Sequence, residues 1–253
     1  MCVQKLYILR LGLLFLLAMV LPNQWLIGEV FASELRLSKV SSVQQPDQQL
    51  QLNLAGQRVG LLVLGDSISA AYGIDKSLGW VALLEERLEQ QCPRVSVHNA
   101  SVSGETTAGG LLRMPGLLER FDPALVVIEL GGNDGLRGLS PAQMQSNFKT
   151  MIRLVRDTGA EPVLLGILIP PNYGEAYRQL FEQAIEDVSR QEQVSLLGFF
   201  LEGVANQTAL MQSDGLHPTA QAQPRLLTNA WQVLDKPLQR LCAELSHSEE
   251  IKL

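Results

Sequence analysis

The amino-acid sequence predicts an α/β domain with three layers, in which a doubly wound, five-stranded parallel sheet lies between two layers of helices. Short apolar runs without polar alternation recur along the chain, as is typical of strands that are buried on both faces. Segments with apolar residues at helical spacing separate these runs. This alternation favours parallel βαβ units, whose ligands bind at the carboxyl ends of the strands.

Each predicted element has its own signal in the sequence. The first strand, residues 58–64, ends at Gly65 and is followed by Asp66 and Ser67. Further short apolar runs predict strands at residues 95–98, 125–130, 162–169 and 194–197. Helical spacing of apolar residues predicts helices at residues 79–90, about 110–120, 141–157, 173–191 and 218–234.

Local chemistry indicates where three of the helices begin. The hydroxyl of Thr107 is expected to cap the helix over residues 110–120. Pro141 and Pro218 suit the first turns of the third and last predicted helices, where no backbone N–H is needed. On this interpretation His217 lies at a helix N-terminus, where the helix dipole disfavours a protonated imidazole.

Residues 1–32 resemble a secretory signal peptide. Lys5 and Arg10 precede an apolar stretch at residues 11–21, and residues 30–32 (Val-Phe-Ala) fit the small-x-small pattern of a cleavage site. The alternative is an uncleaved anchor, because residues 25–27 extend the apolar stretch. Cleavage implies a periplasmic or secreted protein with no stable membrane span.

The rest of the chain divides into three parts by composition. Residues 33–57 are rich in glutamine and are expected to form a flexible polar linker. Residues 58–238 form the predicted domain, and residues 239–253 are interpreted as a polar C-terminal tail. The length suits one such domain with additional segments, and we expect a monomer.

Charge and cysteine content limit the partners and cofactors. The net charge is −6 with no basic run, which argues against nucleic acid as a partner. The chain lacks clustered His and Cys residues at metal-ligand spacing, so a metal centre is not expected. Cys92 and Cys242 either pair in an oxidising compartment or remain two buried thiols, and the sequence leaves both open.

The three histidines of the chain differ in their surroundings. His98 ends a predicted strand and is expected to be packed or hydrogen-bonded, and His247 lies in the polar tail, where we expect it to be solvated. His217 follows Asp214 by three residues across Gly215, so that carboxylate can accept a hydrogen bond from one ring nitrogen. The other nitrogen would then accept the proton of Ser67, as in serine hydrolases.

A serine nucleophile also needs donors for the oxyanion that develops on the substrate. Gly104 has no side chain, so its N–H can approach a substrate closely. Asn133 offers an amide donor. With the N–H of Ser67 these groups would form a three-donor oxyanion hole. Taken singly, Ser67, Gly104 and Asn133 are equally consistent with turn residues, and it is their position after successive strands that favours catalysis.

Five strings of residues, in order, resemble the SGNH, or GDSL-type, hydrolases, and most closely their bacterial periplasmic thioesterase, lysophospholipase and arylesterase members. These strings occupy residues 64–73, 99–107, 129–138, 170–174 and 214–218. The resemblance implies a flavodoxin-like sheet and hydrolysis of acyl esters and thioesters, including lysophospholipids, without a cofactor. It implies that Ser67, Gly104, Asn133 and His217 are the four named residues of the family. Ile68 departs from the usual leucine, and the linker at 33–57 departs from the family's shorter mature chains.

The substrate would be a small-molecule or lipid acyl ester, held in an apolar groove. Five residues on or near the strand-end loops are candidates to line this groove: Leu136, Leu139, Ile169, Pro170 and Tyr173. Gly135 and Gly138 bracket a segment that could act as a mobile flap over the substrate. Two alternatives stay open: a carbohydrate deacetylase of the same superfamily, and a non-catalytic module that binds an anion at the strand-end crevice.

Overall fold

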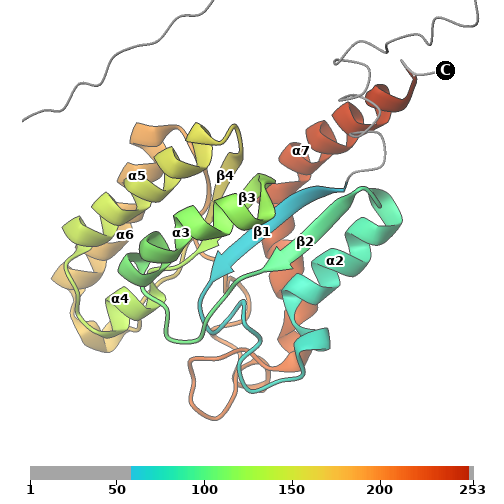
Figure 1. Cartoon of the computed structure of the whole chain (residues 1–253). Helices are drawn as coiled ribbons and strands as arrows, with labels where there is room; N and C mark the ends of the chain where they lie inside the picture. The colour runs from blue at the N-terminus through green and yellow to red at the C-terminus, as the bar shows by residue number, and fades with distance from the viewer. Residues whose placement is uncertain (1–57, 251–253) are drawn as a thin grey trace, which may run out of the picture. The chain divides into compact units, whose positions relative to one another are not determined.

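A five-stranded parallel sheet forms the centre of the computed structural model, which describes residues 58–250 (Figure 1). The strands are β1 (Val59–Gly65), β2 (Val95–Asn99), β3 (Pro123–Glu129), β4 (Glu161–Leu165) and β5 (Ser195–Leu197). They lie in the order β2-β1-β3-β4-β5, and every neighbouring pair is parallel. The predicted fold class is therefore confirmed. The expected signal peptide and linker lie outside the described residues.

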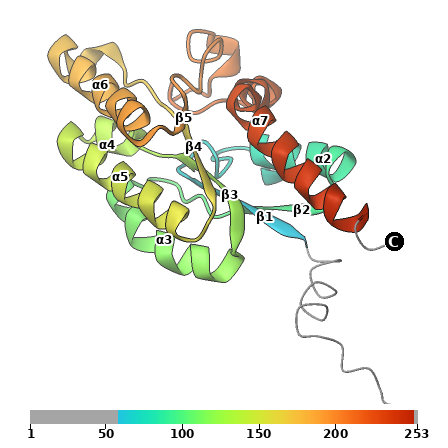
Figure 2. The ribbon, with the colours of Figure 1, turned by 90° about the horizontal axis from the view of Figure 1, so that it is seen from above.

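Helices cover both faces of the sheet, as the view from above in Figure 2 shows. On one face lie α2 (Trp80–Gln91) and α7 (Gln223–Glu250). On the other lie α3 (Thr107–Phe121), α5 (Pro141–Asp157) and α6 (Glu175–Glu192). Side chains of β3 alternate between the two cores, with Val127 in one and Ile128 in the other, and both are fully buried. Burial on both faces is the reason that this strand shows no polar alternation.

The fourth strand is shorter than predicted, because its partner is short. Strand β5 has only three residues, and just beyond the end of β4 the N–H of Gly166 donates to the carbonyl of Leu197, while the Gly166 carbonyl accepts from the N–H of Phe200. Residues 166–169 are apolar without being part of the sheet. Their side chains instead contribute to a cavity at the strand ends.

Two helix starts differ from the sequence prediction. Thr106, not Thr107, caps α3 by accepting the N–H of Gly109, while the hydroxyl of Thr107 donates to the buried carboxylate of Asp134. Pro218 does not open the last helix: it pairs in extended conformation with Met211, and α7 begins at Gln223. His217 therefore does not lie at a helix N-terminus, and the dipole argument for it was wrong.

The predicted polar tail from residue 239 is also wrong, because α7 continues to Glu250. Leu241 and Leu245 extend the apolar stripe of this helix and are packed against the core that it shares with α2. The proline at position 237 and the polar composition hid this stripe in the sequence. A disulfide joins Cys242 on this extension to Cys92 at the end of α2. Within residues 58–250, no helix is long and apolar enough to cross a bilayer.

We predict that the disulfide contributes substantially to stability. It closes a loop of 150 residues, and loops of this size are expected to contribute about 3–5 kcal/mol by restricting the unfolded chain. The double variant Cys92→Ala/Cys242→Ala should therefore have a melting temperature roughly 10 °C below that of the oxidised wild type. Thermal unfolding with and without reductant checks this, and equal melting temperatures would contradict it.

Candidate active site

The predicted site residues lie on loops at the carboxyl ends of the strands. Asp66 and Ser67 follow β1, and the loop after β2 is held against the same end because the N–H of Val102 donates to Gly65 at 3.0 Å. Asn133 follows β3 on a short helix, α4 (Gly132–Leu136). After β1 the chain forms β2 on one side of β1 and then crosses over to form β3 on the other side. Such a reversal in strand order creates a crevice at the carboxyl ends of the strands.

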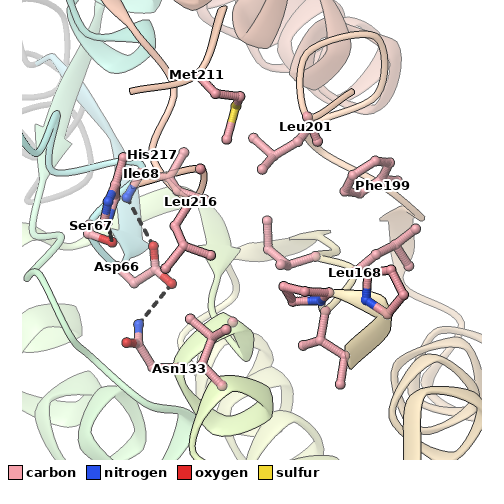
Figure 3. A pocket seen from close by; sticks show the side chains of 18 residues that line it. Asp66, Ser67, Ile68, Asn133, Leu168, Phe199, Leu201, Met211, Leu216 and His217 are labelled. Atoms are coloured by element: carbon pink, nitrogen blue, oxygen red, sulfur yellow. Dashed lines mark hydrogen bonds between the residues drawn. The ribbon is translucent and has the colours of Figure 1, made fainter. Parts of the chain in front are cut away.

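Ser67, His217 and Asp214 form one continuous hydrogen-bonded chain. Figure 3 shows Ser67 and His217, the two members of this chain that line a cavity. The Nε2 atom of His217 lies 2.9 Å from the Ser67 hydroxyl oxygen, and its Nδ1 atom lies 2.6 Å from Asp214 Oδ2. The structure thus brings together three residues that the sequence places up to 150 positions apart. This arrangement has the geometry of a nucleophile, a base and a group that orients the base.

Asp214 keeps its negative charge because it accepts several hydrogen bonds. The bond from the His217 ring has the largest effect, and the backbone N–H groups of His217 and Leu216 donate to Asp214 Oδ1 at 3.0 and 2.9 Å. Together they lower the pKa of Asp214 to about 2. A carboxylate that is ionised at neutral pH favours the imidazole tautomer with the proton on Nδ1, which leaves Nε2 free to accept the proton of Ser67.

The predicted oxyanion donors differ in their surroundings, because Ser67 and Asn133 line one cavity and Gly104 does not. Asn133 Nδ2 donates one hydrogen to Asp66 Oδ2 at 3.1 Å, which leaves its second amide hydrogen for another acceptor. Ser67 and Asn133 line the same cavity. Gly104 lies on the neighbouring β2–α3 loop with φ +80°, and its carbonyl accepts a bond from Arg137 at 3.0 Å. The positive φ explains why glycine occupies this position.

A cavity of about 510 Å³ opens beside Ser67 and His217. Of the five residues predicted to line a groove, Leu136, Ile169 and Pro170 line this cavity, whereas Leu139 and Tyr173 do not. The Tyr173 hydroxyl donates to the carbonyl of Leu136 at 2.8 Å, and its ring packs with the core beneath α6. Leu139 follows Gly138 on an exposed turn, where Tyr177 donates to its carbonyl.

These tyrosine bonds also bear on the predicted flap. Tyr173 ties residues 136–139 to the segment that leads into α6, and Tyr177 ties them to α6 itself. Arg137 ties the same residues to the Gly104 loop. Opening of this segment would break all three bonds, and its mobility stays a prediction.

One wall of the cavity was missed in the sequence. It comes from the segments after β4 and β5 and from the turn before His217, and its residues are Ile167, Leu168, Phe199, Leu201 and Met211. Residues 166–169 were interpreted as the end of a strand because a short apolar run fits either role. Nothing in local spacing indicates that Phe199 and Met211 face the same space.

Behind the site, two acidic side chains are buried next to each other. Glu129 is fully buried at the end of β3, where its Oε2 atom accepts bonds from the Ser69 hydroxyl at 2.7 Å and the Asp66 N–H at 3.3 Å. Trp80 in turn donates to the Ser69 hydroxyl. Burial raises the pKa of Asp66 to about 6, and burial together with the charge of Asp66 raises the pKa of Glu129 well above its usual range. Burial therefore favours the protonated form of both carboxyl groups.

The buried pair predicts a loss of stability as the pH rises. Both groups bind a proton more tightly when folded, so their contribution to stability is full below about pH 4. The contribution of Asp66 is lost as the pH rises through about 6, and the raised pKa of Glu129 makes its contribution fall over the same range and beyond. Glu129→Gln keeps this position neutral at every pH. The fall in melting temperature between pH 5 and pH 8 should therefore be smaller in this variant than in the wild type.

The matched control for this prediction is Glu186→Gln, which changes an exposed carboxylate on α6. Its melting temperature should follow the wild-type pH dependence. If the melting temperatures of all three proteins fall equally between pH 5 and pH 8, the raised pKa of Glu129 is contradicted.

The other histidines fit their predicted roles. His98 stacks on Phe121 with ring centroids 4.5 Å apart and bonds with Ser96, and His247 is exposed on α7. Neither belongs to the cavity described above.

Comparison with known proteins identifies relatives across the described domain. The family profile described as GDSL-like Lipase/Acylhydrolase matches residues 63–224. "Esterase TesA" of Pseudomonas aeruginosa is 56% identical over 178 residues, which cover 70% of this chain and 88% of that protein. "Arylesterase" of Vibrio mimicus is 45% identical over 178 residues, covering 70% and 89%. "Thioesterase 1/protease 1/lysophospholipase L1" of Escherichia coli is 43% identical over 164 residues, covering 65% and 77%.

Solved structures give the same result. The crystal structure of TesA superimposes with a TM-score of 0.68 and covers 71% of this chain and 99% of that one, at 56% identity. The psychrotrophic esterase EstA from Pseudoalteromonas, in a form inhibited by monoethylphosphonate, also superimposes with a TM-score of 0.68. It is 39% identical and covers 71% and 98% of the two chains. This chain has the same fold as these esterases and belongs to the GDSL-like lipase/acylhydrolase family of serine hydrolases.

Proposed function

We propose that this protein hydrolyses acyl esters and thioesters through an acyl-enzyme on Ser67. The observation that carries the proposal is the continuous hydrogen-bonded chain from Ser67 through His217 to Asp214, which opens onto an apolar cavity. A binding module would need neither the aligned serine and imidazole nor the ionised carboxylate behind them. The relatives named esterase, arylesterase and thioesterase support the same reaction class.

In the first half of the reaction, the Ser67 oxygen attacks the carbonyl carbon of the substrate. The hydroxyl proton passes to Nε2 of His217, which lies 2.9 Å away, and the Asp214 carboxylate stabilises the imidazolium that forms. The carbonyl oxygen becomes an oxyanion, for which the N–H groups of Ser67 and Gly104 and the second amide hydrogen of Asn133 are the proposed donors. When the tetrahedral intermediate collapses, the imidazolium returns the proton to the leaving alcohol or thiol.

In the second half, water replaces the leaving group. His217 removes a proton from the water as it attacks the acyl carbon, and the same imidazolium then protonates Ser67 as the acid product leaves. The side chains of this site supply every proton transfer, so these steps need no cofactor.

The walls of the cavity favour an acyl chain over a sugar. Apart from the catalytic residues and Asp66, its side chains are almost all aliphatic or aromatic, including Leu168, Phe199 and Met211. A deacetylase for carbohydrates would need polar partners for the sugar hydroxyls. Arylesters and lysophospholipids, which the names of the relatives suggest, present an apolar acyl or aryl group, and so does acyl-CoA as a candidate thioester.

The leader-like sequence and the disulfide support export of the protein. Disulfides persist in oxidising compartments such as the bacterial periplasm. The bond between Cys92 and Cys242 supports a periplasmic or secreted location, as does the cleavage pattern at residues 30–32. We propose that the mature protein acts there as a monomer on small-molecule or lipid substrates.

The first prediction concerns the nucleophile. Wild type should hydrolyse p-nitrophenyl esters, and Ser67→Ala should reduce kcat by about 10⁴-fold or more, because the covalent route is lost. A fluorophosphonate probe followed by mass spectrometry should label Ser67 in the wild type only. A wild type that neither hydrolyses esters or thioesters nor reacts with the probe would leave the binding-module alternative in its place.

The second prediction concerns the cavity wall. Phe199→Asp places a carboxylate against the proposed acyl chain, so kcat/KM for p-nitrophenyl octanoate should fall at least about tenfold more than for the acetate, whose chain is too short to reach it. Leu112→Asp on the exposed face of α3 is the control and should leave the ratio unchanged. An equal loss on both esters would show that the chain lies elsewhere.

A further inference from the structure

His217 lies on a closed hairpin-like turn that is separate from the helices. The N–H of Gln212 donates to the carbonyl of His217 at 2.7 Å, and the N–H of Thr219 donates to Leu210 at 2.8 Å. Met211 and Pro218 face each other between these bonds. Asp214 and His217 are therefore fixed relative to each other by the turn itself, but this turn must also be held at the correct distance from Ser67.

The side chain of Gln212 bridges this turn and the loop that carries Ser67. Its Nε2 atom donates to the carbonyl of Tyr72 at 2.8 Å and to the carbonyl of Pro218 at 3.0 Å, so both amide hydrogens are used. Tyr72 belongs to the loop after β1, whereas Pro218 directly follows His217. One amide group thus bonds to the backbones on both sides of the catalytic pair.

Two further contacts lie at the same junction. A side chain at Gly73, which has φ +75°, would place its Cβ atom 2.2 Å from the oxygen of the Gln212 amide, so the loop approaches this amide closely. The ring of Tyr72 packs against the imidazole of His217, with centroids 4.5 Å apart. The Gln212 bond therefore holds the residue whose ring contacts the proposed base.

We propose that Gln212 is a positioning residue, which joins the His217 turn to the Ser67 loop and so sets the distance between the two reacting groups. The inference rests on the proposed function of that pair. Gln212 does not line the cavity, so it acts through the loops and not on the substrate. A misplacement of about 1 Å between reacting groups can cost on the order of 100-fold in rate.

The test is Gln212→Met, which keeps the length of the side chain and removes both donors. With p-nitrophenyl acetate, kcat should fall about 10- to 100-fold while KM stays within about twofold, because the cavity is unchanged. The rate of labelling by the fluorophosphonate probe should fall in parallel. The melting temperature should change by no more than a few degrees, since the lost bonds lie in loops.

Gln179→Met is the matched control. Gln179 also donates its amide, to the Glu175 carboxylate at 2.8 Å, but both residues are exposed on α6 and neither lines the cavity. Its kcat should stay within about twofold of wild type. An unchanged kcat in Gln212→Met, or an equal fall in both variants, would overturn the proposed role.

Hydrogen–deuterium exchange tests the link independently of activity. In Gln212→Met, amide exchange should become faster in peptides that cover residues 66–73 as well as in those that cover 210–219, with the helices unchanged. Faster exchange confined to residues 210–219 would mean that Gln212 shapes only its own turn, and the inference would fall. A wild type inert toward esters would instead remove the proposed function, while the exchange pattern still decides whether Gln212 joins the two loops.

Discussion

The pairing of β1 with β3 fixes most of what lies at the site. Gly65 and Glu129 are partners at the last position of this pair, and each strand is held by core packing on both faces. Glu129 accepts bonds from the backbone of Asp66 and the hydroxyl of Ser69, which flank the nucleophile on both sides. A Cβ atom at Gly65 would lie 2.6–2.8 Å from Ser69 and Glu129, so only glycine allows this close approach. The position of Ser67 is thus an outcome of strand packing.

Three carboxyl groups around the serine and the histidine have opposite environments. Asp214 is exposed and accepts three hydrogen bonds, which hold its pKa at about 2. Asp66 and Glu129 are buried and near each other, and their pKa values are raised. A full negative charge behind the proposed oxyanion donors would oppose the charge that develops on the substrate, and the raised pKa values of Asp66 and Glu129 favour the neutral forms that reduce this opposition. The pKa values of these three carboxyl groups therefore differ because the groups differ in solvent exposure and in the number of hydrogen bonds they accept.

The sequence predicts the parts of this protein that depend on local pattern. Both-face burial of β1 and β3 removes polar alternation, so these strands could be located, and Asp214 and His217 are close enough in sequence for their pairing to be inferred. The end of β4 could not be located from the sequence, because it depends on the length of the neighbouring strand, and β5 has three residues. The tertiary use of Thr107 by Asp134 and the start of α7 depend on neighbours distant in sequence. The same holds for Gln212, whose acceptor Tyr72 lies 140 positions away.

The closed turn of residues 210–219 fixes the geometry of Asp214 and His217, while part of the cavity wall lies on another segment. Asp214 and His217 are held by bonds within this turn, whereas Phe199 and Leu201, two walls of the cavity, belong to the segment between β5 and the turn. Changes in that segment can alter the shape of the cavity while the carboxylate and imidazole keep their mutual geometry. Substrate range and proton transfer can accordingly vary by separate mutations, which makes residues 198–206 a suitable region for diversification by natural selection or by design.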